Sequence, residues 1–156
     1  MNHPAPDFEI YTSLRINSLE SSPDAVTKSL GLFPSRVSRK GEQECASGVE
    51  SFAEDFGPLS TKNLWVLHSG LAAENTPLSA QIDALLGQLE GREEPVRKWA
   101  KNAWVTVEAY AHKAVPALTL TPEQMKRMAA LGITLDVDFH DLTQTTNDTI
   151  EETKDA

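Results

Sequence analysis

The stretch FEIYTSLRIN, residues 8–17, alternates apolar and polar side chains and decides the fold. One side of the extended segment is apolar and carries Phe8, Ile10, Leu14 and Ile16. The other side is polar and carries Glu9, Tyr11, Ser13, Arg15 and Asn17. A period of two is typical of a strand with one face buried and one face open. The segment therefore predicts a half-buried strand.

Helical and strand patterns continue from this strand. Ser21 or Ser22 can cap a helix whose first turn contains Pro23 and that Gly31 ends. A short strand is expected after the Pro34 turn, and the apolar run NLWVLHSG predicts another strand. A long amphipathic helical region then begins at Thr76-Pro77, and its apolar stripe is Leu78, Ile82, Leu85, Leu86 and Leu89.

The last third of the chain repeats these signals. Gly91 and Pro95 break the helical region before a second segment that carries Val96, Trp99 and Ala103, and the alternating strand AWVTVEAYAH follows. Residues 121–124, Thr-Pro-Glu-Gln, form a capping box at the start of a helix that ends at Gly132. ITLDVDFH predicts a final strand whose inward side chains are Ile133, Leu135, Val137 and Phe139.

The element order is therefore β-α-β-β-α-β-α-β, and its first six elements have the ferredoxin-like order. We expect an α+β fold with an antiparallel or mixed sheet of about five strands and helices mainly on one face. Residues 1–7 are expected to form a flexible N-terminus and 8–142 a single domain. The remainder, 143–156, is rich in Thr and Glu, lacks an apolar period, and is expected to be a disordered acidic tail.

Composition narrows the classes of function. The chain has 23 acidic and 14 basic residues and a formal net charge of −9. Nucleic-acid binding is not expected, because neutralising phosphates needs a surplus of Lys and Arg. A membrane span or secretory signal is not expected either, and Cys45, the single cysteine, excludes an internal disulfide. These features together indicate a cytoplasmic protein.

Four segments carry a resemblance to a known family: LGLFPSRVSRKGE, LWVLHSG, PLSAQIDALLGQLE and LTLTPEQMKRMAALGITLDVDFH. In this order they resemble the bacterial domain-of-unknown-function family DUF4279, from about Phe8 to Asp141. The resemblance implies a small bacterial α+β protein and no established activity or catalytic residues. It also implies that some relatives have toxin-immunity roles. This chain departs from the family pattern at residues 42–55, which are acidic where relatives are Gly-rich and basic.

Aromatic and charged residues on the polar sides of two predicted strands are the first candidate site. If helices cover only the other face, these side chains form an exposed surface of the composition that binds proteins. If the second helix packs on them instead, they are buried. The partner-binding candidates are Tyr11, Arg15, Trp104, Glu108 and Tyr110, with Glu50, Glu54 and Asp55 of the acidic segment.

The basic cluster Arg36, Arg39 and Lys40 is the second candidate, since guanidinium groups bind phosphate and carboxylate. Alternation on a strand places Arg36 with Lys40 and Arg39 on the opposite face, so the three cations diverge. Only Gly41 follows them, which is too little for a phosphate-binding loop. We therefore expect structural or partner-binding roles for these residues rather than a phosphate pocket.

Asp136, Asp138 and His140 are the third candidate, as possible metal ligands on one side of the last strand. Successive residues on one side of a strand lie about 6.6 Å apart, so His112 or Glu108 of a neighbouring strand would have to complete such a site. The alternative interpretation is an acidic solvent face. Nucleophilic catalysis is not expected, because acidic neighbours disfavour a Cys45 thiolate and LHSG is not a nucleophile elbow.

These observations favour a non-enzymatic, cytoplasmic bacterial protein that needs no cofactor and binds another protein. An acidic chain suits a basic partner, so the most concrete form of this hypothesis is an immunity-type inhibitor of a basic toxin. The alternatives are a small-molecule or anion sensor that uses Arg36, Arg39 and Lys40, and a metal-dependent hydrolase that uses Asp136, Asp138 and His140.

Overall fold

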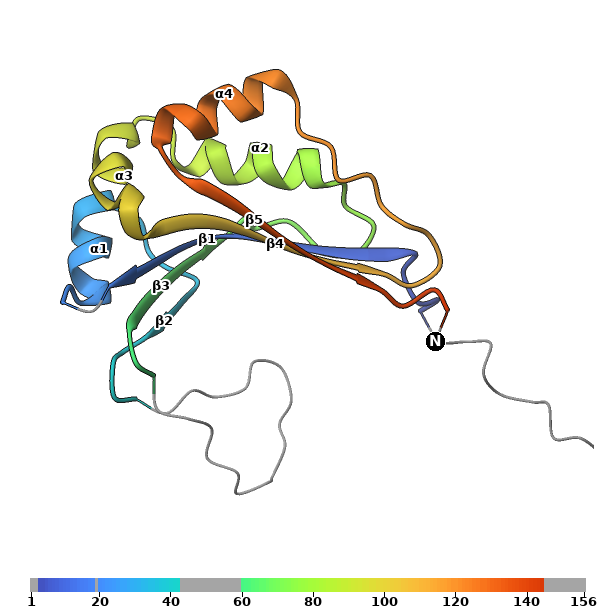
Figure 1. Cartoon of the computed structure of the whole chain (residues 1–156), viewed down its shortest axis with the longest axis horizontal. Coiled ribbons are helices and arrows are strands. Elements are labelled where there is room, and N and C mark those ends of the chain that lie inside the picture. The colour runs from blue at the N-terminus through green and yellow to red at the C-terminus, as the bar shows by residue number, and fades with distance from the viewer. Residues whose placement is uncertain (1–2, 19, 43–59, 145–156) are drawn as a thin grey trace, which may run out of the picture.

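The computed structural model of the chain describes residues 3–18, 20–42 and 60–144 (Figure 1). Its five-stranded sheet has the order β2-β3-β1-β4-β5. The strands are β1 (Phe8–Ser18), β2 (Arg36–Ser38), β3 (Asn63–His68), β4 (Ala103–Ala111) and β5 (Thr134–Asp141). The helices of the described residues are α1 (Pro23–Leu30), α2 (Leu78–Gln88), α3 (Glu93–Trp99), the short 3-10 helix η1 (Ala100–Asn102) and α4 (Pro122–Leu131).

The sheet is mixed, and the predicted α+β class and element order are confirmed. β1 is the central strand and pairs antiparallel with β3 on one side and β4 on the other. β2 pairs antiparallel with β3, whereas β5 pairs parallel with β4. β3 therefore lies between β1 and β2, and β1 lies between β3 and β4, which is the split βαβ arrangement of a ferredoxin-like fold.

The predicted alternation of β1 is confirmed by its burial. Ile10, Leu14 and Ile16 are at most 1% exposed and belong to one hydrophobic core. All four α-helices contribute to this core, with side chains such as Leu30, Leu85, Val96 and Leu131. The helices therefore cover the same face of the sheet (Figure 1), which we call the inner face. The opposite face is called the outer face.

Helix ends form where the sequence predicts them. The Ser22 hydroxyl accepts a hydrogen bond from the backbone N–H of Ala25, and Gly31 ends α1 with a left-handed φ of 64°. Thr121 and Gln124 make the predicted capping box at the start of α4. Such caps satisfy backbone groups that the helix itself leaves without partners.

A buried glutamine connects α2 to the central strand. Gln81 is 1% exposed, and its amide nitrogen donates to the carbonyl of Ile10 while its carbonyl accepts from the Ser69 hydroxyl at 3.1 Å. This stretch of β1 lies beyond the end of β3, and the backbone N–H of Ile10 donates instead to the carbonyl of Ala73 at 3.0 Å. Gln81 and the carbonyl of Ala73 thereby satisfy the two backbone groups of Ile10 that β3 does not reach.

Burial on β5 differs from the prediction. Ile133 is 8% exposed, but Val137 and Phe139 are 42% and 40% exposed although they lie on the inner face. β5 has a sheet neighbour on one side only, and it runs on past the helices toward the end of the sheet (Figure 1). The prediction of which β5 side chains point inward is therefore correct, but the end of β5 lies beyond the helices that cover the inner face.

No helix among the described residues combines the length and the apolar character that a membrane span needs.

Candidate functional site

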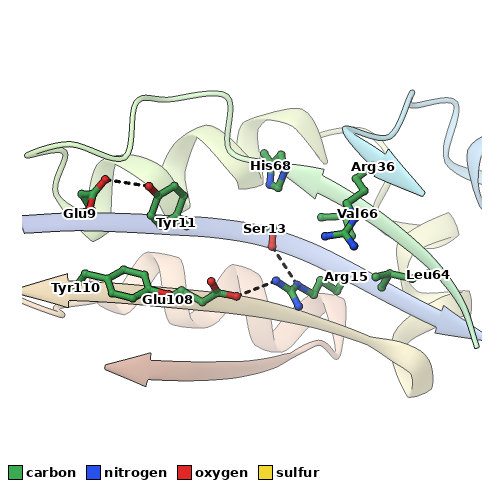
Figure 2. A pocket seen from close by; sticks show the side chains of 10 residues that line it. All are labelled: Glu9, Tyr11, Ser13, Arg15, Arg36, Leu64, Val66, His68, Glu108 and Tyr110. Atoms are coloured by element: carbon green, nitrogen blue, oxygen red, sulfur yellow. Dashed lines mark hydrogen bonds and ion pairs between the residues drawn. The ribbon is translucent and has the colours of Figure 1, made fainter. Parts of the chain in front are cut away.

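The outer face of the sheet holds a cavity of about 530 Å³. Strand alternation and register bring its lining together from four strands: Glu9, Tyr11, Ser13 and Arg15 of β1, Arg36 of β2, Leu64, Val66 and His68 of β3, and Glu108 and Tyr110 of β4. Figure 2 shows these side chains above the strands. The size falls within the range of small-molecule sites.

One end of the cavity is cationic. Register places Arg15 opposite Val66 and Val66 opposite Arg36, so the two arginines lie in one row across β1, β3 and β2. His68 lies two residues beyond Val66 on the same side of β3, opposite Ser13. Partial burial, and then the positive charges of Arg15 and Arg36, lower the pKa of His68, while Glu108 acts in the opposite direction. The imidazole is therefore neutral near pH 7.

An ion pair crosses the middle of the cavity. The Arg15 guanidinium donates to the Glu108 carboxylate at 2.9 Å, and both side chains are 34% exposed (Figure 2). The Nε of Arg15 also reaches the Ser13 hydroxyl at 3.5 Å. These contacts restrict the Arg15 side chain before any ligand or partner arrives. A group held in one rotamer loses less conformational entropy on binding.

The other end of the cavity is aromatic and acidic. The Tyr11 hydroxyl donates to the Glu9 carboxylate at 2.9 Å, and its ring meets Tyr110 edge to face with a centroid distance of 6.1 Å. Tyr110 in turn stacks on His140 at 4.7 Å. Nε2 of His140 lies 3.0 Å from the Asp138 carboxylate. This end is thus a connected aromatic surface that continues onto the edge strand β5.

Both tyrosines keep their phenol protons at neutral pH. Partial burial, followed by the hydrogen bond to Glu9, raises the pKa of Tyr11. Partial burial, followed by the negative charge of Glu108, raises the pKa of Tyr110. The two hydroxyl groups are therefore hydrogen-bond donors rather than phenolate nucleophiles, which suits binding.

The family model described as Domain of unknown function (DUF4279) matches residues 8–142, which is most of the chain. The chain belongs to the DUF4279 family. No curated protein and no solved structure matches it. The DUF4279 membership confirms the predicted resemblance and assigns no activity to the outer face, so a function has to be argued from the geometry.

The structure brings five of the predicted partner-binding residues of this DUF4279 chain onto one surface. Tyr11, Arg15, Trp104, Glu108 and Tyr110 all lie on the outer face, on the neighbouring strands β1 and β4. The described helices pack against the inner face, so they do not cover these side chains. The other three predicted residues, Glu50, Glu54 and Asp55, lie outside the described residues.

The basic cluster separates as its alternation predicts. Arg36 lines the cavity on the outer face. Arg39 reaches the Asp24 carboxylate of α1 at 3.4 Å, and thus lies on the helix side of the sheet. Lys40 does not line the cavity, and its backbone N–H donates to the Asn63 side chain at 2.9 Å. The three cations therefore share no pocket.

The three predicted metal ligands share the outer face of β5 but do not converge. His140 pairs with Asp138, and register places Asp136 opposite Thr106. Glu108, which the sequence offered as a fourth ligand, is bonded to Arg15. The described part of the chain contains no group of three or more His, Cys, Asp or Glu side chains that could hold a metal ion.

Sequence reasoning did not single out His68 and Val66 as site residues. The segment Asn63–His68 was interpreted as a nearly continuous apolar run, and such a run does not show which residues face outward. Val66 is only 2% exposed although it lies on the outer face, since the row of Arg15 and Arg36 flanks it. His68 comes two residues after Val66, and residues at this spacing lie on the same side of a strand. This spacing is the signal that could have identified His68.

Proposed function

We propose that this chain is a non-enzymatic protein of the bacterial cytoplasm that binds another protein through the outer face of its sheet. The observation that carries the proposal is that the described helices leave this face open while it presents Tyr11, Tyr110, Trp104 and Arg15 together. Tyr, Trp and Arg are the side chains that most often dominate the binding energy of protein interfaces. Two of them, Tyr11 and Arg15, are held by hydrogen bonds in the free protein.

The partner that fits this face is basic. Four carboxylates lie on its β1, β4 and β5 side: Glu9, Glu108, Asp136 and Asp138. The chain as a whole has a net charge of −9, which attracts a basic protein over long distances and raises the association rate. An immunity-type inhibitor of a basic toxin is the most concrete form of this proposal.

The test is recovery of the protein from its native cell, followed by native mass spectrometry and a binding titration with the identified partner. We expect one stoichiometric basic protein, with an association rate that falls as salt is added. The double substitution Tyr11→Ala, Tyr110→Ala is expected to weaken binding by about 30-fold or more, since hot-spot truncations cost about 2 kcal/mol or more.

The matched control is Met125→Ala on α4. Met125 is 51% exposed, comparable with Tyr11 at 48%, but it belongs to a helix on the inner side of the sheet. Its substitution is expected to leave the affinity unchanged. If the Met125 variant loses binding and the double tyrosine variant keeps it, the partner uses the helix side and the proposed surface is wrong.

A further inference from the structure

Two guanidinium groups flank Val66 on the outer face. Arg15 and Arg36 sit on either side of Val66 in one cross-strand row, which places their backbones about 10 Å apart, twice the spacing between strands. In Figure 2 the Arg36 side chain extends from β2 toward β1, over Val66. Two guanidinium groups on either side of one small apolar side chain repel each other unless an anion binds between them.

Of the two arginines beside Val66, only Arg15 pairs with a carboxylate in the described residues. On the β4 side Glu108 accepts from Arg15 at 2.9 Å. On the β2 side the Arg36 guanidinium makes no ion pair or hydrogen bond with any residue in 3–18, 20–42 or 60–144. Its neighbour in sequence, Arg39, is paired with Asp24. Arg36 is thus an exposed cation in a cavity that lacks its counter-charge in the described chain.

His68 adds a hydrogen-bond donor beside the same spot. Three charged groups face its ring: Arg15 from β1, Arg36 from β2 and Glu108 from β4. Burial and the two arginines lower the pKa of His68, so the free protein holds a neutral imidazole there. An anion placed between the arginines would offset their charges and favour the protonated ring.

The rest of the lining is apolar, aromatic and acidic, but its two carboxylates are already bonded: Glu9 accepts from Tyr11 and Glu108 from Arg15. Leu64 and Val66 form the apolar part nearest the two arginines, and Tyr11 and Tyr110 line the far end. A ligand that fills about 530 Å³ is larger than an inorganic ion. The chemistry therefore selects a molecule with an anionic head and an apolar body.

We propose that the outer-face cavity binds a small organic anion, with a carboxylate or phosphate head between Arg15 and Arg36 and an apolar body that extends past His68 toward Tyr11. His68 donates a hydrogen bond to the head. Guanidinium groups bind both kinds of head through paired N–H donors. This site shares Arg15 and Tyr11 with the surface proposed for the protein partner, but its test needs no partner. It differs from the cluster of Arg36, Arg39 and Lys40, since only Arg36 belongs to both.

The experiment is an NMR titration of the full chain with three probes that share an aromatic body: phenylacetate, phenyl phosphate and the uncharged benzyl alcohol. The structure predicts saturable shifts at Val66 and His68 with one or both anions and none with benzyl alcohol. Binding of one anion alone identifies the preferred head. Equal binding of benzyl alcohol, or no saturation by either anion, would overturn the proposal.

The pH dependence gives a second readout. A bound anion stabilises the imidazolium, so the pKa of His68, followed by its ring resonances, is expected to rise by about one unit at saturation. By linkage, the affinity then increases as the pH falls through the His68 pKa, by about tenfold in total. A bound probe that leaves the His68 titration unchanged would place the anion elsewhere.

The test variant is Arg36→Gln, with Arg97→Gln as its control. Both remove one exposed positive charge, but Arg97 is on α3, a helix on the inner side of the sheet. Arg36→Gln is expected to weaken anion binding at least tenfold with an unchanged melting temperature, and Arg97→Gln is expected to bind like the native chain. Equal losses in both variants would show a general charge effect and no site.

Discussion

Replacing Trp65 with alanine is expected to lower the free energy of unfolding by about 3–5 kcal/mol, the range for truncating a large buried aromatic side chain. Trp65 is fully buried on the inner face, where register places it between Ile16 of β1 and Val37 of β2. Its indole N–H also donates to the Thr27 hydroxyl at 3.0 Å. The side chain therefore joins three strands and α1, and no neighbouring group can fill its volume.

Urea unfolding monitored by circular dichroism measures this loss. Two further variants separate the contribution of the hydrogen bond from that of ring burial. Trp65→Phe keeps most of the ring volume but removes the hydrogen bond to Thr27, so we expect a loss of about 0.5–1.5 kcal/mol plus a small packing term. Trp104→Ala makes the same truncation at a half-buried tryptophan on the outer face. A loss at Trp104 as large as that at Trp65 would contradict the assignment of the inner face as the core.

Leu85→Ala is expected to cost about 2–5 kcal/mol, because the substitution leaves a cavity that the surrounding core fills only in part. Leu85 is 0% exposed and its neighbour Leu86 is 2% exposed, both on the stripe of α2 that packs into the core. The same range applies to Leu86→Ala. The measurement is the midpoint and slope of urea unfolding, which together give the change in stability.

Leu71→Ala, in the connection between β3 and α2, is the exposed-leucine control for these substitutions. Leu71 is 46% exposed, so its truncation removes little buried area and is expected to change stability by about 0.5 kcal/mol or less. Losses below about 1 kcal/mol at both Leu85 and Leu86 would mean that another side of α2 faces the sheet.

The elements of this fold could be predicted because local signals specify them. The alternation of β1 fixes which of its faces is buried, and the caps at Ser22 and Thr121 fix where two helices begin. The strand order could not be read in this way. β1 pairs with β4 across a long separation, as at Arg15 and Trp104, and neither periodicity nor turn chemistry encodes such a pairing. Burial at the end of β5 depends on how far the helices reach, which is also a tertiary property.

The candidate site, like the fold, could be predicted from the sequence only in part. Tyr11, Arg15, Glu108 and Tyr110 could be selected from the sequence because each alternates with an apolar residue. The proximity of Arg36 to Arg15 could not, because it depends on β3 lying between their strands. Alternation correctly places Arg36 and Arg39 on opposite faces of the sheet. Only the fold shows that Arg39 pairs with Asp24, whereas Arg36 lines the cavity.

The central position of β1 has a consequence for protein synthesis. Its two neighbours, β3 and β4, are both translated later, and about 85 positions separate Ser18 from Ala103, where β4 begins. At a translation rate of about 5–20 residues per second, the ribosome needs roughly 4–17 s to reach β4 after completing β1. Throughout that interval one edge of β1 lacks its strand partner β4, and the apolar side of β1 gains the helices α1, α2 and α3 only as they are translated. The nascent chain therefore cannot complete its core stepwise from the N-terminal side, and β1 is the segment that a chaperone would have to shield until β4 is made.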